Sequence, residues 1–253
     1  MKLAPVFLLL TSVGVFSLVT VGGATPIAAP ALAVTPPCTE TMEEDIPSCP
    51  STGCGEAGDA LLNTAKNRFG AVTSPQAVTL KNIRDFAQPD TWDTGSPRDS
   101  IADIEGRPVV VMGFLLKAKR EGAESCNCGI TGASNTDIHL VLVSKLPDLD
   151  DEDEVNEAEA NSVTAEITPR VRQHGHPKWV VKNINDFEGE FVRLTGRMML
   201  DTKHIPQAHR LPHERQNKPL KRATSWEVHP VTRFQVCTRT VSKCRQGLGW
   251  QNF

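Results

Sequence analysis

The sequence predicts a mainly β protein. Its centre is expected to be a small five-stranded barrel of the oligonucleotide/oligosaccharide-binding (OB) type with one helix, preceded by an irregular, disulfide-stapled N-terminal arm with a short helix. Five runs of apolar and β-branched residues lie between residues 105 and 240. Their order, three strands, a helix and two strands, is that of an OB barrel. Glycines inside the first and fourth runs suit the sharp bends of a small closed barrel.

The five runs have the lengths and residue types of strands. They are residues 108–117, 137–144, 162–168, 190–200 and 223–237. The third run alternates, which places Val163, Ala165 and Ile167 on one face. Part of residues 169–187 is expected to form the helix between the third and fourth strands. An open sheet or another small barrel would fit the same five runs.

The region before the barrel predicts an irregular arm. Residues 34–56 are rich in Pro, Ser, Thr, Gly and Cys, a composition typical of loops. Residues 59–69 carry apolar side chains at helical spacing, and Asp59 is placed to cap that helix. Residues 70–106 are polar and are expected to form loops. The expected organisation is an arm over residues 34–104, an OB-like domain over 105–240 and a tail over 241–253.

Residues 1–33 predict a cleavable secretory signal. Lys2 precedes an apolar run over residues 6–21, and small residues continue to Ala33, which are the three parts of such a signal. The apolar run is shorter than the ~20 residues that span a bilayer. We expect cleavage after Ala33, with Ala24 as the alternative. The mature chain is then secreted or held in the periplasm or cell envelope, without stable membrane insertion.

Seven cysteines fall in three groups along the chain. In an exported protein this number predicts a disulfide framework with one cysteine left over. The simplest pattern pairs Cys237 with Cys244, and two among Cys38, Cys49 and Cys54.

Cys126 and Cys128 leave several alternatives open. A bond between them would close a tight, redox-labile ring. Each can instead pair elsewhere, for example with the N-terminal arm, or serve as a thiolate ligand to a metal.

Charge is divided unevenly along the chain. Residues 34–160 contain 10 basic and 23 acidic residues, a net charge of −13, whereas residues 161–253 contain 16 basic and 7 acidic residues, a net charge of +9. Such a split is typical of a surface for anionic partners, or of two halves that face each other in the fold.

Two short motifs point to chemistry. Asp137-x-His139 and Glu227-x-His229 each place a carboxylate and an imidazole two residues apart, on one face of a strand. Asp201 comes directly after the fourth strand. If these strands are neighbours, the side chains converge at one rim of the barrel.

The residue types at this rim suit a divalent metal ion such as zinc. The expected ligands are His139, Asp201, His204 and His229, with Glu227 as the general base that activates a water molecule. The alternative is a hydrogen-bonded network that only joins strand ends.

The connection between the fourth and fifth strands, residues 201–222, is basic. In OB barrels this loop and the loop between the first two strands flank the ligand face, so we expect it to bind an anionic polymer. The candidate ligand-binding residues are Arg210, Arg215, Lys218, Lys221 and Arg222. The loop lacks aromatic side chains on which single-stranded bases stack, although nucleic acid stays among the candidate ligands.

The run over residues 148–159 is strongly acidic. Several of its carboxylates match the spacing of a calcium loop, but Asp153 occupies the position of the required glycine. We therefore expect a solvated hairpin loop here.

Six segments between residues 105 and 240 carry a resemblance. They are Gly-Phe-Leu-Leu from Gly113, Glu-Ser-Cys-Asn-Cys from Glu124, Thr-Asp-Ile-His-Leu from Thr136, Ile-Thr-Pro-Arg from Ile167, Arg-Leu-Thr-Gly-Arg-Met-Met-Leu-Asp from Arg193 and Trp-Glu-Val-His-Pro-Val-Thr from Trp226. In content and order they resemble a group of uncharacterised exported bacterial proteins with an OB-like domain. The resemblance implies an architecture, and it implies no mechanism because that group has no assigned activity.

The sequence favours an exported, non-enzymatic OB-like binding module for an anionic ligand, such as a polysaccharide, a cell-wall polymer or nucleic acid. A metal-dependent hydrolase of phosphoesters is the first alternative, and a structural or interaction protein of the cell envelope is the second. The sequence contains no nucleophile elbow, phosphate-binding glycine loop or dinucleotide fingerprint.

Overall fold

The computed structural model describes residue 38 and residues 45–55, 58–208 and 220–253. Residues Leu32–Phe253 belong to one compact unit. Arg210, Arg215 and Lys218 of the expected basic loop lie outside the described residues, as does the expected signal over residues 1–33.

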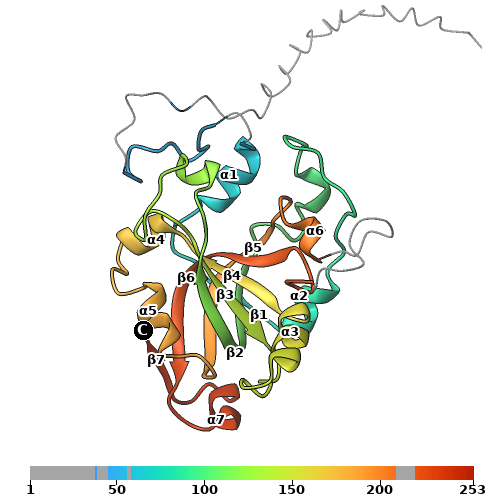
Figure 1. Cartoon of the computed structure of the whole chain (residues 1–253), viewed down its shortest axis with the longest axis vertical. Helices are drawn as coiled ribbons and strands as arrows, with labels where there is room; N and C mark the ends of the chain where they lie inside the picture. Colours follow the sequence, from blue (N-terminus) through green and yellow to red (C-terminus); the bar gives the residue numbers. More distant parts are fainter. Residues whose placement is uncertain (1–37, 39–44, 56–57, 209–219) are drawn as a thin grey trace, which may run out of the picture. The chain divides into compact units, whose positions relative to one another are not determined.

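Five strands close into a barrel (Figure 1). They are β2 (Pro108–Arg120), β3 (Ile138–Val143), β4 (Val163–Ile167), β5 (Phe191–Leu200) and β6 (Trp226–Cys237). The order around the barrel is β2-β3-β4-β6-β5, and β5 pairs back to β2. The β4–β6 pair is parallel, while the other four pairs are antiparallel. The prediction of a mainly β fold with a closed five-stranded OB-type barrel is confirmed.

Gly196 shows how the sequence allows the barrel to close. The β5–β6 register shifts on both sides of Gly196, and a Cβ atom there would lie 2.4 Å from the carbonyl oxygen of Pro230. Only glycine permits this approach of the two backbones. The internal glycine of β5 therefore marks a bulge, as expected for a small barrel.

The strands alternate between the barrel interior and its outer face. Ile138, Leu140 and Leu142 of β3 belong to the main apolar core, together with Ala165 and Ile167 of β4. Because side chains on a strand alternate, the residues between them face outward. This period places polar side chains of β3, β4 and β6 on one common outer face, where they are nevertheless buried.

The arm contributes α1 (Ala60–Lys66), which lies at one end of the barrel (Figure 1). Asp59 caps this helix as expected, since its Oδ1 accepts hydrogen bonds from the backbone N–H groups of Leu61 and Leu62. The expectation of loops alone over residues 70–106 is wrong. The segment contains β1 (Gln76–Val78), α2 (Leu80–Asp85) and the 3₁₀ turn η1 (Asp99–Ile101), which are too short to show periodicity.

The acidic run forms a helix, α3 (Glu152–Ala160), so the expectation of a hairpin loop is wrong. Asp151 caps its N-terminus by accepting from the N–H groups of Asp153 and Glu154. Carboxylates in the first turn favour the positive end of the helix dipole, which explains why so polar a segment is helical.

The remaining elements connect the strands or follow the barrel. The 3₁₀ turn η2 (Ser125–Asn127) lies between β2 and β3, and α4 (Pro169–Gln173) and α5 (Val181–Asn185) lie between β4 and β5, where the sequence predicts a helix. The others are α6 (Ile205–Ala208), α7 (Val241–Arg245) and β7 (Trp250–Asn252), which pairs with β6.

Three disulfides join Cys38 to Cys54, Cys49 to Cys128, and Cys237 to Cys244. The predicted Cys237–Cys244 bond and one bond among the first three cysteines are thus confirmed, and Cys128 pairs with the arm. Disulfides of this kind persist in oxidising, extracytoplasmic compartments. Among the described residues, no helix has the length and apolar content needed to cross a membrane.

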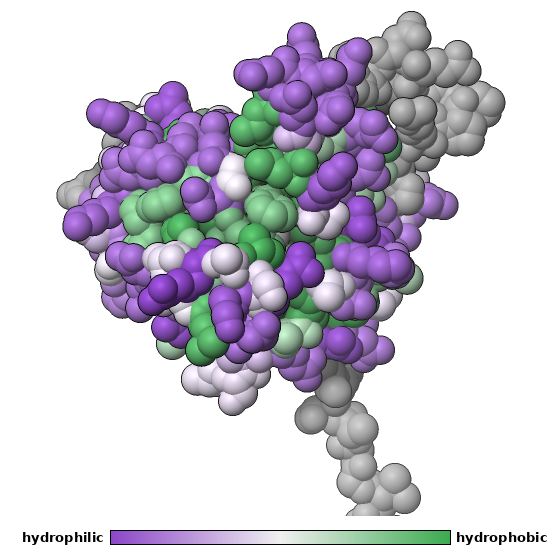
Figure 2. Space-filling view, turned by 90° about the horizontal axis from the view of Figure 1, so that it is seen from below, coloured by the Kyte–Doolittle hydropathy of each residue, from purple (hydrophilic) through white to green (hydrophobic). Residues whose placement is uncertain are grey.

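The opposite end of the barrel, near α7, is apolar. Seen from this end, apolar side chains gather in the middle of the surface and hydrophilic ones surround them (Figure 2). A cavity of about 390 Å³ lies between β1, β2, β5 and α7, with Leu80, Met112 and Phe191 among its lining residues. This end of the barrel therefore carries an apolar patch, whereas the end near α1 carries ionisable side chains.

Candidate metal centre

Ionisable side chains gather on the outer face of β3, β4 and β6, at the end of the barrel near α1. We call this group the charged cluster. Its members are Lys66, Glu121, Glu124, Cys126, Asp137, His139, Glu166, Asp201, His204, Arg222, Glu227 and His229. Most of them are fully buried, and Glu121, Glu124 and His204 form its half-exposed edge.

Strand register brings these residues together. His139 of β3 lies directly opposite Glu166 of β4. The parallel pair Ala165–Val228 then sets Glu166 beside Glu227 and His229 of β6. The sequence-based expectation that the motifs of β3 and β6 meet at one rim agrees with this arrangement.

The centre of the cluster is formed by Asp137, Glu166 and His229, whose donor atoms all lie within 4.8 Å of one another. His229 Nδ1 is 2.9 Å from Glu166 Oε2 and 3.0 Å from Glu227 Oε1, while His229 Nε2 is 3.8 Å from Asp137 Oδ2. We call Asp137, Glu166 and His229 the central group.

Several donor atoms of the central group have no hydrogen-bond partner among the described residues. They are Asp137 Oδ2, both carboxylate oxygens of Glu166 and His229 Nε2. Each Glu166 oxygen nevertheless has an imidazole nitrogen in ion-pair contact, Oε1 with His139 Nε2 and Oε2 with His229 Nδ1. Asp137 Oδ2 and His229 Nε2 are therefore the atoms of the central group that are left without a close partner among the described residues. Buried polar atoms are almost always hydrogen-bonded, so unpartnered atoms that lie close together indicate a site that can bind an ion.

Burial and mutual contact shift the pKa values of this group strongly. Burial, together with the carboxylates of Glu124 and Glu166, raises the pKa of Asp137 to about 7. Burial opposes the charged form of His229, but Glu166 and Glu227 outweigh it and raise the pKa of that imidazole to about 10. In the metal-free protein at neutral pH, His229 is therefore protonated.

Glu166 carries the opposite shift. Burial would raise its pKa, yet the positive charges of His139, Lys66 and His229 hold it well below its usual range. Glu166 thus stays ionised with no exposure to solvent, and in the metal-free protein only nearby cations compensate its charge.

The flanking carboxylates already have strong partners. Asp201 Oδ2 accepts a hydrogen bond from His204 Nδ1 at 2.5 Å, and Glu227 Oε2 accepts one from Arg222 at 3.0 Å. Glu166, Asp201 and Glu227 also form a compact group of possible ligands, but two of its three carboxylates are engaged elsewhere. The central group therefore has fewer hydrogen-bond partners than the group of Glu166, Asp201 and Glu227.

The residues expected from the sequence occupy different places in this arrangement. Among the described residues, His229 and Asp201 belong to compact groups of possible ligands, whereas His139 and His204 belong to none. His139 contacts Glu121 and Glu166, and His204 contacts Asp201. In this arrangement the two histidines contact carboxylates of the cluster, and their expected role as metal ligands stays a prediction.

Glu166 and Lys66 were not among the sequence-based candidates. A single Glu in a strand has no spacing motif, although a charged residue between the apolar Ala165 and Ile167 is a usable signal. Lys66 ends α1 and reaches the cluster, where its Nζ lies 2.6 Å from Glu124 and 3.8 Å from both Glu166 and Asp201.

The expected basic ligand surface is only partly described. Arg222 is buried against Glu227 and is therefore not part of an exposed basic surface. Lys221 is half-exposed and lies 3.7 Å from Glu159. The other three expected residues, Arg210, Arg215 and Lys218, lie outside the described residues.

The arm covers the cluster. The Cys49–Cys128 disulfide ties residues 45–55 to the loop around η2, and Arg170 donates hydrogen bonds to Asn67 and to the carbonyl oxygens of Cys49 and Pro50. In OB barrels this outer face and its flanking loops are the usual ligand surface. Here the same place holds the charged cluster.

Comparison with protein-family models, curated proteins and solved structures gave no match. The fold and the site define the class: an OB-type barrel with a buried carboxylate–histidine cluster on its outer face.

Proposed function

We propose that this protein is an exported OB-type module that holds a divalent metal ion on its ligand face and binds an anionic ligand there. Asp137, Glu166 and His229 are the proposed metal ligands. The observation that carries the proposal is the set of fully buried donor atoms in the central group that have no hydrogen-bond partner among the described residues.

Electrostatics supports a cation at this point. A buried charge without a partner costs several kcal/mol, and the central group brings the carboxylates of Asp137 and Glu166 together beside the imidazole of His229. His139 and Lys66 also face Glu166, which leaves Asp137 as the carboxylate with the least cationic compensation. A divalent ion would compensate both carboxylates at once. Zinc suits a set of one imidazole and two carboxylates. Manganese is the alternative, because it prefers oxygen ligands more strongly than zinc does.

The distances also suit a shared ion. Two ligands of one tetrahedral zinc ion lie about 3.3 Å apart. His229 Nε2 and Asp137 Oδ2 are 3.8 Å apart, and both lack another partner among the described residues. A shift of a few tenths of an ångström would bring them to that spacing.

The surrounding contacts have the pattern that orients metal ligands. Asn127 donates a hydrogen bond to Asp137 Oδ1 at 2.8 Å, which leaves Oδ2 free. Glu227 Oε1 lies 3.0 Å from His229 Nδ1, which leaves Nε2 free. Partners of this kind fix the orientation and the tautomer of ligating side chains.

An anionic group would reach the unfilled position of such a cation through the half-exposed edge of the cluster at Glu121, Glu124 and His204. Three protein ligands leave a fourth position of a zinc ion for water or for a ligand oxygen. Phosphate, sulfate and carboxylate groups supply such oxygens. The three disulfides agree with an oxidising compartment outside the cytoplasm. The signal expected over residues 1–33 predicts export to such a compartment.

Hydrolysis of phosphoesters is a second candidate function. The observation that favours it is the same count of three protein ligands, because a metal-bound water in the fourth position becomes a nucleophile near neutral pH. Glu227, the general base expected from the sequence, contacts His229 Nδ1 and Arg222, so its part in that reaction would be to orient the imidazole through which the ion is held.

The proposal is tested by titrating the metal-free protein, with its disulfides intact, with Zn²⁺ in a calorimeter. We expect tight binding by the wild type and a loss of at least tenfold in affinity for Glu166→Gln and for His229→Gln. Glu159→Gln is the matched control, because Glu159 is a buried carboxylate of α3, outside the charged cluster, whose partners are Lys117 and Lys221. Equal affinities in all four proteins would contradict the assignment.

The anionic ligand is tested on immobilised heparin, a sulfated polysaccharide, with and without Zn²⁺. We expect retention that increases with Zn²⁺ and disappears in Glu166→Gln. Hydrolysis is tested with bis(p-nitrophenyl) phosphate, where turnover by the zinc-loaded wild type and none by Glu166→Gln would favour the second candidate. Retention that ignores Zn²⁺ would contradict a metal-mediated ligand site.

A further inference from the structure

Cys126 lies in η2, at the edge of the charged cluster. It is the free cysteine among the described residues, and it is 1% exposed. A buried free cysteine usually acts as a small apolar side chain. That explanation does not suit this position, because the neighbours of Cys126 are ionisable.

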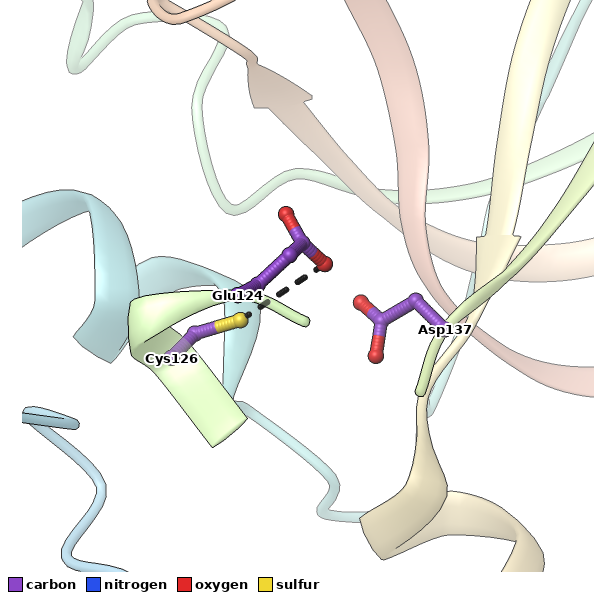
Figure 3. A group of neighbouring side chains, drawn as sticks. All are labelled: Glu124, Cys126 and Asp137. Atoms are coloured by element: carbon purple, nitrogen blue, oxygen red, sulfur yellow. Dashed lines mark hydrogen bonds between the residues drawn. The ribbon is translucent and has the colours of Figure 1, made fainter. Parts of the chain in front are cut away.

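Two carboxylates face the thiol (Figure 3). Cys126 Sγ donates to Glu124 Oε2 at 3.9 Å, and the carboxylate of Asp137 points toward the same space. One donor atom from each of Glu124, Cys126 and Asp137 lies within 4.8 Å of the other two. Glu124 and Cys126 belong to the turn at η2, and Asp137 directly precedes β3, so two separate segments of the fold meet at this point.

Each carboxylate is held through one oxygen, which leaves the other available to a ligand. Lys66 binds Glu124 Oε1 at 2.6 Å, and Asn127 binds Asp137 Oδ1 at 2.8 Å. Glu124 Oε2 accepts from the thiol, and Asp137 Oδ2 is fully buried and has no hydrogen-bond partner among the described residues. Buried oxygens beside a thiol and a second carboxylate form a donor set that suits a metal ion.

A redox or nucleophilic role does not suit Cys126. Burial, with the nearby carboxylates of Glu124 and Asp137, raises the pKa of this thiol well above its usual value. Reactive cysteines have lowered pKa values and access to solvent. Metal binding, in contrast, deprotonates even a thiol of high pKa.

We propose that Glu124, Cys126 and Asp137 form a second metal subsite, which takes a thiophilic divalent ion such as zinc and shares Asp137 with the central group. This inference rests on the proposed function, since it extends the same metal centre toward η2. When the ion binds, the metal–sulfur bond replaces the S–H bond and one proton leaves to solvent, so the step needs no oxidant or reductant.

A shared carboxylate places two ions close together. In enzymes that cleave phosphoesters, two ions about 3.5–4 Å apart clamp the attacking and leaving oxygens of one phosphoryl group. The second subsite thus makes a phosphoester or phosphate group the ligand that suits the centre best, because its oxygens can contact both ions while the phosphoryl group is transferred.

The test uses Co²⁺ as a spectroscopic substitute for Zn²⁺, with the wild type, Cys126→Ala and Glu166→Gln, all with disulfides intact. We expect two equivalents of Co²⁺ in the wild type and a near-ultraviolet band from thiolate-to-cobalt charge transfer. Cys126→Ala should lose the band and one equivalent. Glu166→Gln should keep the band and lose the other equivalent.

The outcomes separate this inference from the proposed function. A wild type that binds one equivalent without a thiolate band overturns the second subsite and leaves the central metal ion in place. A wild type that binds no metal overturns both. If Cys126→Ala does not fold, as judged by circular dichroism, the band in the wild type and in Glu166→Gln decides alone, because the other six cysteines are in disulfides.

Discussion

Two ionic regions of this protein, one partly buried and one buried, are built on different rules. In the first, Arg98 donates hydrogen bonds to both carboxylate oxygens of Glu105, at 2.5 and 2.6 Å. The fork of the guanidinium fits the carboxylate, so both oxygens of the anion are satisfied. In the charged cluster, Asp137 Oδ2 has no hydrogen-bond partner among the described residues, and Glu166 is paired only through its contacts with His139, His229 and Lys66.

The difference shows that this fold can compensate a buried carboxylate when structure alone requires it. The Lys117–Glu159 pair, at 2.9 Å, follows the same rule as Arg98 and Glu105. The cluster departs from that rule on the one face where OB barrels bind ligands. We therefore interpret its unpartnered atoms as the ligands of a cation-binding site.

The largest expected effect is on stability, from removing one cation of each region. Arg98→Met and Lys66→Met each leave a buried carboxylate without its partner, so each should lower the free energy of unfolding by about 3–5 kcal/mol in metal-free protein. Urea denaturation measures both. Excess Zn²⁺ should restore part of the loss in Lys66→Met, because the ion supplies positive charge to the cluster, and none in Arg98→Met. Equal responses of the two variants to Zn²⁺ would remove the distinction between the regions.

The next effect is the stabilisation of the wild type by the metal itself. A ligand at a hundred times its dissociation constant stabilises the folded state by about 2.7 kcal/mol. Thermal unfolding with and without Zn²⁺ should show this gain in the wild type and in Glu105→Gln, although that variant starts from a lower stability. His229→Gln should show no gain. A zinc response that survives in His229→Gln would place the ion elsewhere.

A third prediction concerns pH. Because the pKa of His229 is raised to about 10, its charged form contributes stability that is fully present below the ordinary histidine pKa of ~6.5 and is lost as pH rises through about 10. Zinc must displace that proton, so affinity should rise between pH 6 and 8, by roughly tenfold per pH unit for each proton released. Calorimetry in buffers of different ionisation enthalpy counts the protons. Binding without proton release would exclude His229 as a ligand.

The smallest expected effects come from the helix caps. Asp59→Ala and Asp151→Ala should each cost about 1 kcal/mol of stability, since each removes a side chain that accepts from two N–H groups of its helix. Of these two helices, α1 carries Lys66 into the cluster, so Asp59→Ala should also weaken Zn²⁺ binding, whereas Asp151→Ala should not. Parallel urea denaturation and zinc titration of the two variants separate stability from site geometry.

The barrel could be predicted from the sequence because its signal is local. Alternation in β4 and apolar runs in β2 and β3 identify strands wherever they end up in the fold. The Asp-x-His and Glu-x-His motifs carry their own geometry, since residues two apart share a face. The expected convergence at one rim therefore needed only the correct strand order.

The rest depends on register and on contacts between distant segments. Glu166 becomes central because it lies opposite His139 and next to β6, and nothing in the chain near Glu166 encodes that pairing. Lys66 enters the cluster from the arm, 58 residues before its partner Glu124. The short elements β1 and α2 lack periodicity, and α3 is stabilised by its cap and its dipole instead of an apolar face.

The most direct test of the account is the metal content of the full chain, purified with its disulfides formed and without chelators, measured by elemental mass spectrometry. The account predicts at least one equivalent of a divalent transition metal in the wild type and its loss in Glu166→Gln, with Glu159→Gln unchanged. Less than a tenth of an equivalent in the wild type, with no uptake after dialysis against Zn²⁺, would contradict it.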